Sequence, residues 1–325
     1  MKKGKLFTLL PLIAIVSTGC NNNGQSSFSS DENKIHNIGI CQLVAHPALD
    51  KATEGFMKAV KEGLGEDKVK FDLQEAAGDS ATCVTIANSF VNKKVDLIMA
   101  NATPALQACA NATLTIPVLG TSITEYGVAL NLKDFNGTVG GNVSGTSDLA
   151  PLDGQADMFT ELLPEAKNIG LLYCSAEANS KYQVDTVKAL LEKKGLTTKM
   201  IAFSESNQLQ SVLTAGIQGL DALYIPTDNT CADNTNLIDS ICRPEELPII
   251  CGEEGLCAGC GIASLSIDYF NLGLKTGQMA VEILKDGKDI STMPIAYDEN
   301  PVKKFNKEIC DELGITVPAD YVQIG

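Results

Sequence analysis

The sequence lacks most of the residues and motifs on which enzymes and metalloproteins depend. Its 325 residues include two histidines, His36 and His46, and a metal site built on them would need further ligands in a geometry that the sequence does not show. There is no G-x-S-x-G, H-E-x-x-H or Walker A motif, and no G-x-G-x-x-G after the first predicted strand. We therefore expect a protein that is not an enzyme and that carries no metal and no cofactor.

Positive charge and long hydrophobic runs are also scarce. The chain has 25 Lys and Arg against 40 Asp and Glu, a formal net charge of −15, and so acidic a surface repels the phosphate backbone of nucleic acids. No hydrophobic stretch reaches the ~18 residues that a transmembrane helix needs. The 44% of hydrophobic residues is ordinary for a globular protein, and the length predicts about two domains.

The N-terminus has the pattern of an export signal. Three lysines in MKKGK precede an apolar run of eleven residues, 6–16, and small residues then lead to Cys20. The Gly-Cys junction resembles the bacterial lipobox, in which the cysteine becomes the lipidated first residue, although Ser17 stands where that pattern usually has Leu, Val or Ile. We expect a signal peptide over 1–19 and lipidation of Cys20. The alternative is an ordinary signal peptide with a chance cysteine.

The segment after the predicted cleavage site is polar and rich in Ser and Asn. It shows no periodicity, which is typical of a flexible tether, and we assign residues 20–33 to it. Together with the lipidated cysteine, this predicts an exported protein anchored to the outer face of the bacterial cytoplasmic membrane.

From residue 35 onward, short apolar runs alternate with amphipathic segments of helical length, the pattern of an α/β fold with parallel strands. Three blocks of the first half then recur in the same order in the second half. The matched pairs are 34–43 with 165–174, 95–104 with 220–229, and 115–124 with 246–255. An ordered triple at nearly constant spacing predicts two Rossmann-like lobes of one topology.

The chain left over after the second copy is what two lobes need to exchange segments. We expect it to cross between them near 144–151, 265–268 and 293–298, so that a three-segment hinge borders a ligand cleft. The expected N-terminal lobe is 34–146 with about 267–292, and the expected C-terminal lobe is 147–266 with about 293–325.

Six stretches carry a resemblance to a known family: GICQLVAHPALDKATEGF (39–56), NSFVNKKVDLIMANATPALQA (88–108), NVSGTSDLAPLDGQ (142–155), KNIGLLYCSAEANS (167–180), ALYIPTDNT (222–230) and SIDYFNLGLKTGQMA (266–280). They resemble the ABC-transporter substrate-binding lipoproteins of the tryptophan/tyrosine type, which have the type I periplasmic-binding-protein fold. The resemblance implies a monomeric receptor that captures an amino acid, usually aromatic or otherwise hydrophobic. It would deliver this ligand to a membrane permease with a cytoplasmic ATPase. The alternative is a surface receptor or adhesin on the same fold that binds a ligand without importing it.

Candidate binding residues follow from where such folds bind ligands, beyond the carboxyl ends of the strands. An amino acid needs helix N-termini and hydroxyls for its carboxylate, and a partly desolvated carboxylate for its ammonium. Thr103 and Asp228 are equivalent in the repeat and are expected to face each other across the cleft, although each is also a candidate helix cap. Asp268 is equally a candidate hinge cap, and His46 is expected at the cleft rim. The predicted ligand-binding residues are Gln42, Thr103, Thr121, Ser122, Asn179, Ser180, Asp228, Asn229, Glu253 and Asp268.

Ten cysteines remain after Cys20, most of them inside apolar runs, where free cysteine packs as a small hydrophobic residue. The segment CGEEGLCAGCG (251–261) contains one C-x-x-C, which is half a zinc site, and no second pair lies at a suitable spacing. Local disulfides, Cys231–Cys242 and Cys251–Cys260, stay open as alternatives to core packing. So does an enzymatic or metal-thiolate role for this cysteine cluster with the Glu253–Glu254 pair.

Overall fold

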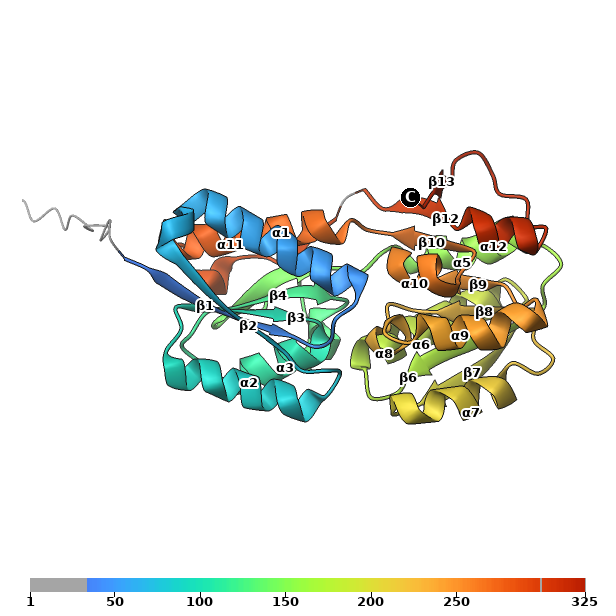
Figure 1. Ribbon diagram of the computed structural model, residues 1–325, viewed down its shortest axis with the longest axis horizontal. Coiled ribbons are helices and arrows are strands. Elements are labelled where there is room, and N and C mark those ends of the chain that lie inside the picture. The colour runs from blue at the N-terminus through green and yellow to red at the C-terminus, as the bar shows by residue number, and fades with distance from the viewer. Residues whose placement is uncertain (1–33, 299, 325) are drawn as a thin grey trace, which may run out of the picture. The chain divides into compact units, whose positions relative to one another are not determined.

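The structure is a computed structural model that describes residues 34–298 and 300–324, and these form two α/β lobes (Figure 1). The expected signal peptide, Cys20 and the tether lie outside the described residues. The first sheet has the order β11-β5-β4-β3-β1-β2. Its strands are β1 (His36–Gln42), β2 (Val69–Glu75), β3 (Leu97–Asn101), β4 (Val118–Ile123), β5 (Val143–Ser147) and β11 (Ala296–Tyr297).

The second sheet has the order β13-β12-β10-β9-β8-β6-β7. Its strands are β6 (Asn168–Cys174), β7 (Thr197–Phe203), β8 (Ala222–Ile225), β9 (Ile249–Cys251), β10 (Ala263–Ser266), β12 (Val302–Phe305) and β13 (Val322–Gln323). All described pairings in both sheets are parallel except β10 with β12. The strand orders β2-β1-β3-β4-β5 and β7-β6-β8-β9-β10 are the same, so the α/β class and the duplicated topology predicted from the repeat are confirmed.

Helices cover both faces of each sheet. The helices of the first lobe are α1 (Pro47–Leu64), α2 (Ser80–Lys93), α3 (Thr103–Ala112), α4 (Tyr126–Ala129) and α11 (Tyr269–Leu284). Those of the second lobe are α5 (Leu152–Leu162), α6 (Ala178–Lys193), α7 (Ser206–Gly216), α8 (Asn229–Ala232), α9 (Thr235–Cys242), α10 (Glu254–Cys260) and α12 (Lys307–Glu312). Single 3₁₀ turns are η1 (Glu66–Lys68), η2 (Arg243–Glu245) and η3 (Ile290–Thr292).

Alternation along each strand divides each lobe into two apolar layers. In β1, Ile38 and Ile40 pack with Phe56 of α1, whereas Cys41 packs with α2 and α3 on the other face. In β6, Leu171 and Leu172 divide in the same way between α5, α6 and α12 on one side and α7 to α10 on the other. Strands covered on both faces explain why these runs are almost continuously apolar.

The repeat also extends to the polar ends of the strands. Asp96 accepts a hydrogen bond from the backbone N–H of Asn37, at 2.8 Å. Its counterpart Asp221 accepts from the backbone N–H groups of Lys167 and Asn168, each at 2.8 Å. In both lobes, therefore, an aspartate just before the third strand fixes the start of the first strand.

The chain crosses between the sheets three times, as the sequence led us to expect. It leaves the first sheet after β5, returns between β10 and α11, and leaves again between β11 and β12. Because β11 pairs with β5, the first sheet extends to Tyr297, a few residues beyond the expected lobe boundary at 292. The backbone N–H of Asp268 donates to Asp298 at 3.2 Å, which ties the second crossing to the third.

Helices α1 and α11 of the first lobe lie side by side (Figure 1) and approach closely because small residues line their contact. A Cβ atom on Gly273 would lie 2.0 Å from the carbonyl oxygen of Ala52, and one on Gly55 would lie 2.2 Å from that of Phe270. Both obstacles are backbone atoms, which cannot turn aside as a flexible side chain can.

Gly273→Ala is therefore expected to destabilise the protein by about 1–3 kcal/mol, because the two helices must separate to admit the methyl group. Thermal or urea unfolding measures this. Gln278→Ala, at an exposed position of the same helix, is the control and should change the free energy of unfolding by less than about 0.5 kcal/mol. Equal stability of the two variants would contradict the close packing described here.

Candidate functional site

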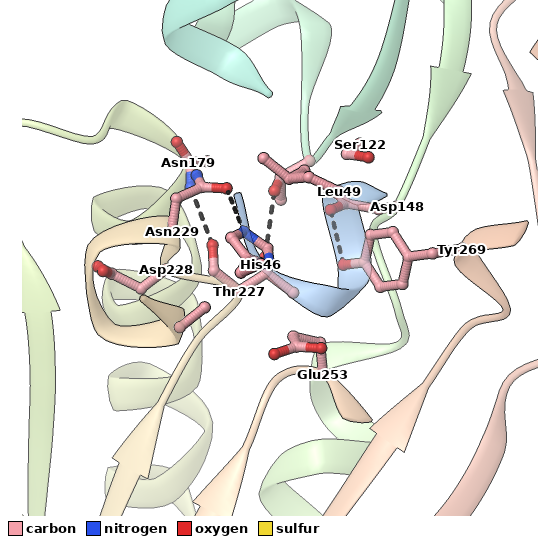
Figure 2. Close-up of a pocket in the computed structure, with 12 residues that line it drawn as sticks. His46, Leu49, Ser122, Asp148, Asn179, Thr227, Asp228, Asn229, Glu253 and Tyr269 are labelled. Carbon is pink, nitrogen blue, oxygen red and sulfur yellow. Dashed lines mark hydrogen bonds between the residues drawn. The ribbon is translucent and has the colours of Figure 1, made fainter. Parts of the chain in front are cut away.

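A cavity lies between the carboxyl-terminal ends of the two sheets and is lined by both lobes (Figure 2). Its lining residues are His46, Leu49, Ser122, Thr124, Asp148, Asn179, Thr227, Asp228, Asn229, Ala232, Glu253 and Tyr269. Its volume is about 10 Å³, room for roughly one water molecule. The lobes are thus closed on each other in this structure.

Side chains of the two lobes bond directly across this closed cleft. His46 Nε2 lies 3.3 Å from Asn229 Oδ1, and the hydroxyl oxygens of Thr124 and Thr227 are 3.3 Å apart. Gln183 donates to Thr227 Oγ1 at 2.6 Å and steadies the second lobe's side of that contact.

Five of the ten predicted binding residues line the cavity: Ser122, Asn179, Asp228, Asn229 and Glu253. His46, expected at the cleft rim, lines it as well.

Gln42 and Thr121 lie beside the cavity but turn their side chains inward. Gln42 accepts from Thr53 at 2.6 Å and donates to Asp50 at 2.7 Å, so it joins the end of β1 to α1. The hydroxyl of Thr121 lies 3.2 Å from that of Thr146, inside the first lobe. Both side chains therefore hydrogen-bond within the first lobe at the ends of β1 and β4 and do not line the cavity.

Thr103, Ser180 and Asp268 are also absent from the lining. Thr103 is the first residue of α3 and is buried, so the equivalence with Asp228 does not bring the two residues together at this cavity. Ser180 is buried in the first turn of α6, where it accepts from Asn179 at 3.3 Å. Asp268 caps α11 by accepting from the backbone N–H of Asn271 at 3.0 Å, the role of a hinge cap.

Six lining residues were not predicted: Leu49, Thr124, Asp148, Thr227, Ala232 and Tyr269. Thr124 and Thr227 stand in the same strand-end loops as predicted residues, so the loops themselves were the available signal. Asp148 and Tyr269 belong to hinge segments, and only the folding of two crossings onto each other brings them together.

Two of the cavity's carboxyl groups act as helix caps. Asp228 accepts from the backbone N–H groups of Cys174 and Cys231, at 2.6 and 2.8 Å. Glu253 accepts from those of Gly255 and Leu256, each at 2.5 Å. Burial raises the pKa of both groups, that of Asp228 to about 7 with the nearby Glu177 carboxylate contributing. The N-termini of α8 and α10 are thus occupied by the protein's own carboxylates.

Asp148 differs from these caps because one of its oxygens has no partner. It follows β5 at the first crossing and accepts from the Tyr269 hydroxyl at 3.0 Å through Oδ2, whereas buried Oδ1 accepts no hydrogen bond. Burial raises its pKa to about 6. An oxygen of this kind is a ready acceptor for a cationic group that enters the cavity.

Ser122 reaches the cavity through an irregularity in β4. The pairing register of β4 with β5 shifts between Gly120 and Ile123, and Ser122 has a φ of 56°, unusual for a residue other than glycine. Thr121 therefore faces the lobe interior, while Ser122 lines the cavity and its buried hydroxyl has no partner. Such strained positions concentrate at functional sites.

Unpartnered polar atoms converge on this cavity. The described residues contain seven buried side-chain nitrogen or oxygen atoms without a hydrogen-bond partner, and four of them belong to the lining: His46 Nδ1, Ser122 Oγ, Asp148 Oδ1 and Asn179 Oδ1. An unsatisfied buried polar group costs about 1–3 kcal/mol. Their meeting at one place is what a site for a small polar ligand requires.

The metal-thiolate and disulfide alternatives gain no support from the described part of the chain. Residues 34–298 and 300–324 contain no group of three or more His, Cys, Asp or Glu side chains arranged to hold a metal ion. The ten cysteines after Cys20 are buried with free thiols. No helix in these ranges is both long and apolar enough to cross a bilayer.

The family model described as ABC transporter substrate binding protein matches residues 37–323. The chain belongs to this family. It is 38% identical, over 293 residues, to a tyrosine-binding protein of Clostridioides difficile, an alignment that covers 88% of this chain and 84% of that protein. The predicted family resemblance is thereby confirmed.

Two solved structures of this type differ in how closely they match. A domain from Streptococcus pneumonia in complex with L-Trp has a TM-score of 0.85 at 35% identity, covering 90% of this chain and 100% of that one. The ligand-free, open structure of a Clostridium difficile substrate-binding protein with adhesive properties has a TM-score of 0.68 at 36% identity, covering 89% and 99%. At nearly equal identity, this chain matches the ligand-bound neighbour better, as its closed cleft leads one to expect. The fold is that of the type I periplasmic binding proteins.

Asp148→Asn should stabilise the ligand-free protein at pH 7.5 by about 1–3 kcal/mol, because it removes a charge whose burial raises the pKa by roughly two units. With its pKa at about 6 instead of the usual 3.8, this group adds stability that is fully present below about pH 4 and lost as the pH rises through about 6. Wild type should therefore lose more stability than the variant between pH 5 and 7.5. Thermal unfolding at both pH values measures it.

Asp153→Asn is the control, because Asp153 is exposed in the first turn of α5 and its loss should leave this pH dependence unchanged. If Asp148→Asn is no more stable than wild type at pH 7.5, burial of the Asp148 charge does not destabilise the protein.

Proposed function

We propose that this protein is the extracytoplasmic, monomeric solute-binding lipoprotein of an ABC uptake transporter. It binds one amino acid, aromatic or otherwise hydrophobic, between two lobes that close on it. It then delivers this ligand to a membrane permease with a cytoplasmic ATPase. The observation that carries the proposal is the convergence of four unpartnered buried polar atoms on one interlobe cavity.

The polar groups on the hinge side suit the zwitterionic end of an amino acid. Asp148 Oδ1 offers a buried, unpartnered acceptor for the ammonium. Helix α1 begins beside the cavity without a side-chain cap, so its first free N–H groups, with the unpartnered Ser122 hydroxyl, suit the carboxylate. Helix α6 also begins uncapped, but the carboxylates of Glu177 and Asp228 lie beside its first turn and repel an anion there.

The remaining walls favour a ligand with an apolar side chain. Leu49, Ala232 and the ring of Tyr269 line the cavity, and no Lys or Arg is among its lining residues. A cavity of about 10 Å³ admits an amino acid only after the lobes separate, which the three hinge crossings allow. A relative named for tyrosine binding and a neighbour in complex with L-Trp support the aromatic version.

Calorimetry of the purified protein against all twenty amino acids tests the proposal. We expect a dissociation constant in the micromolar range or below for at least one of Trp, Tyr and Phe. Ser122→Ala should weaken that binding about tenfold or more, since a hydrogen bond to a charged group contributes about 1.5–3 kcal/mol.

Ser264→Ala is the matched control, because Ser264 is also a buried strand serine with an unpartnered hydroxyl but does not line the cavity. It should bind as wild type does. If calorimetry detects no heat with Trp, Tyr or Phe, the proposal of an aromatic ligand is wrong. If both serine variants bind with equal affinity, Ser122 does not contact the ligand.

The membrane anchor is the second part of the proposal and rests on the sequence of the first 33 residues. Cys20→Ser should move the protein from the membrane fraction to the soluble extracellular fraction, and mass spectrometry should find the mature wild type heavier by its lipid. Cys242→Ala, at a buried thiol of the second lobe, should stay in the membrane fraction. Membrane retention of Cys20→Ser would refute lipid anchoring at this residue.

A receptor or adhesin without import is the second candidate function. It is favoured by the adhesive properties stated for the Clostridium difficile neighbour at 36% identity. Uptake of the labelled ligand separates the two functions, because loss of the protein abolishes high-affinity uptake only if it supplies a permease.

A further inference from the structure

We propose that this protein docks on its permease through a surface without charged residues, which spans both lobes and makes uncharged contacts rather than ion pairs. The surface, here called the neutral face, comprises the exposed residues of 80–92, 103–115 and 206–218. The inference rests on the proposed function and adds the docking surface and the chemistry of the partner that fits it.

Charge is absent from three surface segments of a strongly charged chain. Charged residues make up 20% of the sequence and the formal net charge is −15, yet these three ranges contain no Asp, Glu, Lys or Arg. They hold α2 up to its penultimate residue, α3 with the turn after it, and α7. Asp79 and Glu205 immediately precede α2 and α7 and bound the neutral face there. Because α2 follows the second strand of the first lobe and α7 that of the second, charge is missing from equivalent helices of the duplicated topology.

The neutral face is exposed, and its polar groups are amides and hydroxyls. Asn88 of α2 and Gln210 of α7 are both exposed. Apolar side chains lie among them, with Leu114 85% exposed and Val84 48% exposed. A groove of about 320 Å³ runs between α2 and α3, and both Val84 and Asn88 line it. Charged residues are depleted in the centres of protein interfaces and abundant on free surfaces, so this composition indicates a surface that another molecule covers.

The neutral face lies beside the route by which a ligand leaves the closed cleft. A second cavity between the lobes, of about 400 Å³, is lined by Ser80 and Pro104 at the starts of α2 and α3 and by Ser206 at the start of α7. Asn229 lines both this cavity and the small ligand cavity. None of the three hinge crossings lines the larger cavity, so it lies on the side away from the hinge. In Figure 1, α2 and α3 lie at the lower edge of the first lobe and α7 at the lower edge of the second.

The partner that fits this face is itself uncharged where it makes contact. Charged groups set against the neutral face would lose water without gaining an ion pair. A second copy of this chain is disfavoured, because molecules of net charge −15 repel each other. The permease has to receive the ligand at the end of the route described above. Its external surface, with amides, hydroxyls and apolar side chains at the contact, is therefore the partner that we assign to this face.

The experiment adds one negative charge to the neutral face at a time. Asn88→Asp and Gln210→Glu do so with little change of shape, and neither residue lines the ligand cavity. Uptake of labelled Tyr or Trp, whichever wild type binds more tightly in calorimetry, is measured below saturation in cells whose only copy is the variant, at equal protein amounts. We expect each variant to lower uptake about tenfold or more, because the added charge must lose its water on docking. Calorimetry of the same variants should give the ligand affinity of wild type, which also shows that they fold.

Two controls separate charge from shape and position. Gln278→Glu makes the same change at an exposed position of α11, which packs on the other face of the first sheet from α2 and α3. Gln210→Asn changes the shape of the neutral face but adds no charge. Both should keep uptake within about twofold of wild type, as surface substitutions usually have small effects.

The outcomes distinguish this inference from the proposed function. If wild type supports no uptake, import is wrong and the neutral face has no permease to bind. If wild type imports and both charge variants import as well as Gln278→Glu, the function stands and the inference is wrong. If Gln210→Asn lowers uptake as far as Gln210→Glu does, docking does not depend on the absence of charge, and the inference is again wrong. If sedimentation finds wild type to be a dimer and Asn88→Asp a monomer, a second copy occupies the face in place of the permease.

Discussion

Three carboxyl groups, those of Asp148, Asp228 and Glu253, are buried around one small cavity that no Lys or Arg side chain lines. Removing carboxylates from water costs several kcal/mol per ion unless partners compensate. Asp228 and Glu253 receive two backbone N–H groups each, which offsets part of this cost, although burial still raises the pKa of both groups. Asp148 accepts a hydrogen bond from the Tyr269 hydroxyl through Oδ2, and the hydroxyls of Tyr269 and Thr124 lower its pKa by less than burial raises it. Its other oxygen, Oδ1, is buried without a hydrogen-bond partner, and no Lys or Arg lines the cavity to neutralise the carboxylate.

The strand-end loops of the two lobes differ in how many of their carboxylates are buried. In the first lobe, the buried Asn101 is neutral and donates to the carbonyl of Leu49 at 2.8 Å and to the hydroxyl of Thr53 at 3.0 Å, whereas the capping carboxylates Asp79 and Glu125 are exposed or half-buried. In the second lobe, the carboxylates of Glu177, Asp228 and Glu253, which accept from backbone N–H groups at helix N-termini, are all buried. The second lobe therefore presents acceptors to the cleft. The uncapped start of α1 in the first lobe keeps free donors.

The sequence contained enough to predict the lobes and their crossings, because both depend on local periodicity and an ordered repeat. It also predicted which strand ends carry polar residues, and Ser122, Asn179, Asp228, Asn229 and Glu253 all line the cavity. It could not separate Thr121 from Ser122, since a shift in strand register decides which of the two faces inward. Nor could it predict Asp148, which reaches the site because two hinge segments fold against each other.

The position of Asp148 joins the charge of the site to the movement of the lobes. Asp148 lies on the first crossing, and its partner Tyr269 begins the helix that follows the second, so their hydrogen bond spans two of the three hinge segments. Closing the cleft removes water from this carboxylate, which is unfavourable while the carboxylate is alone. An ammonium group on Asp148 offsets that cost only when the lobes are closed around it. A cation bound at this position therefore favours the closed state by its differential interaction with the two states, which is what ligand-driven closure requires.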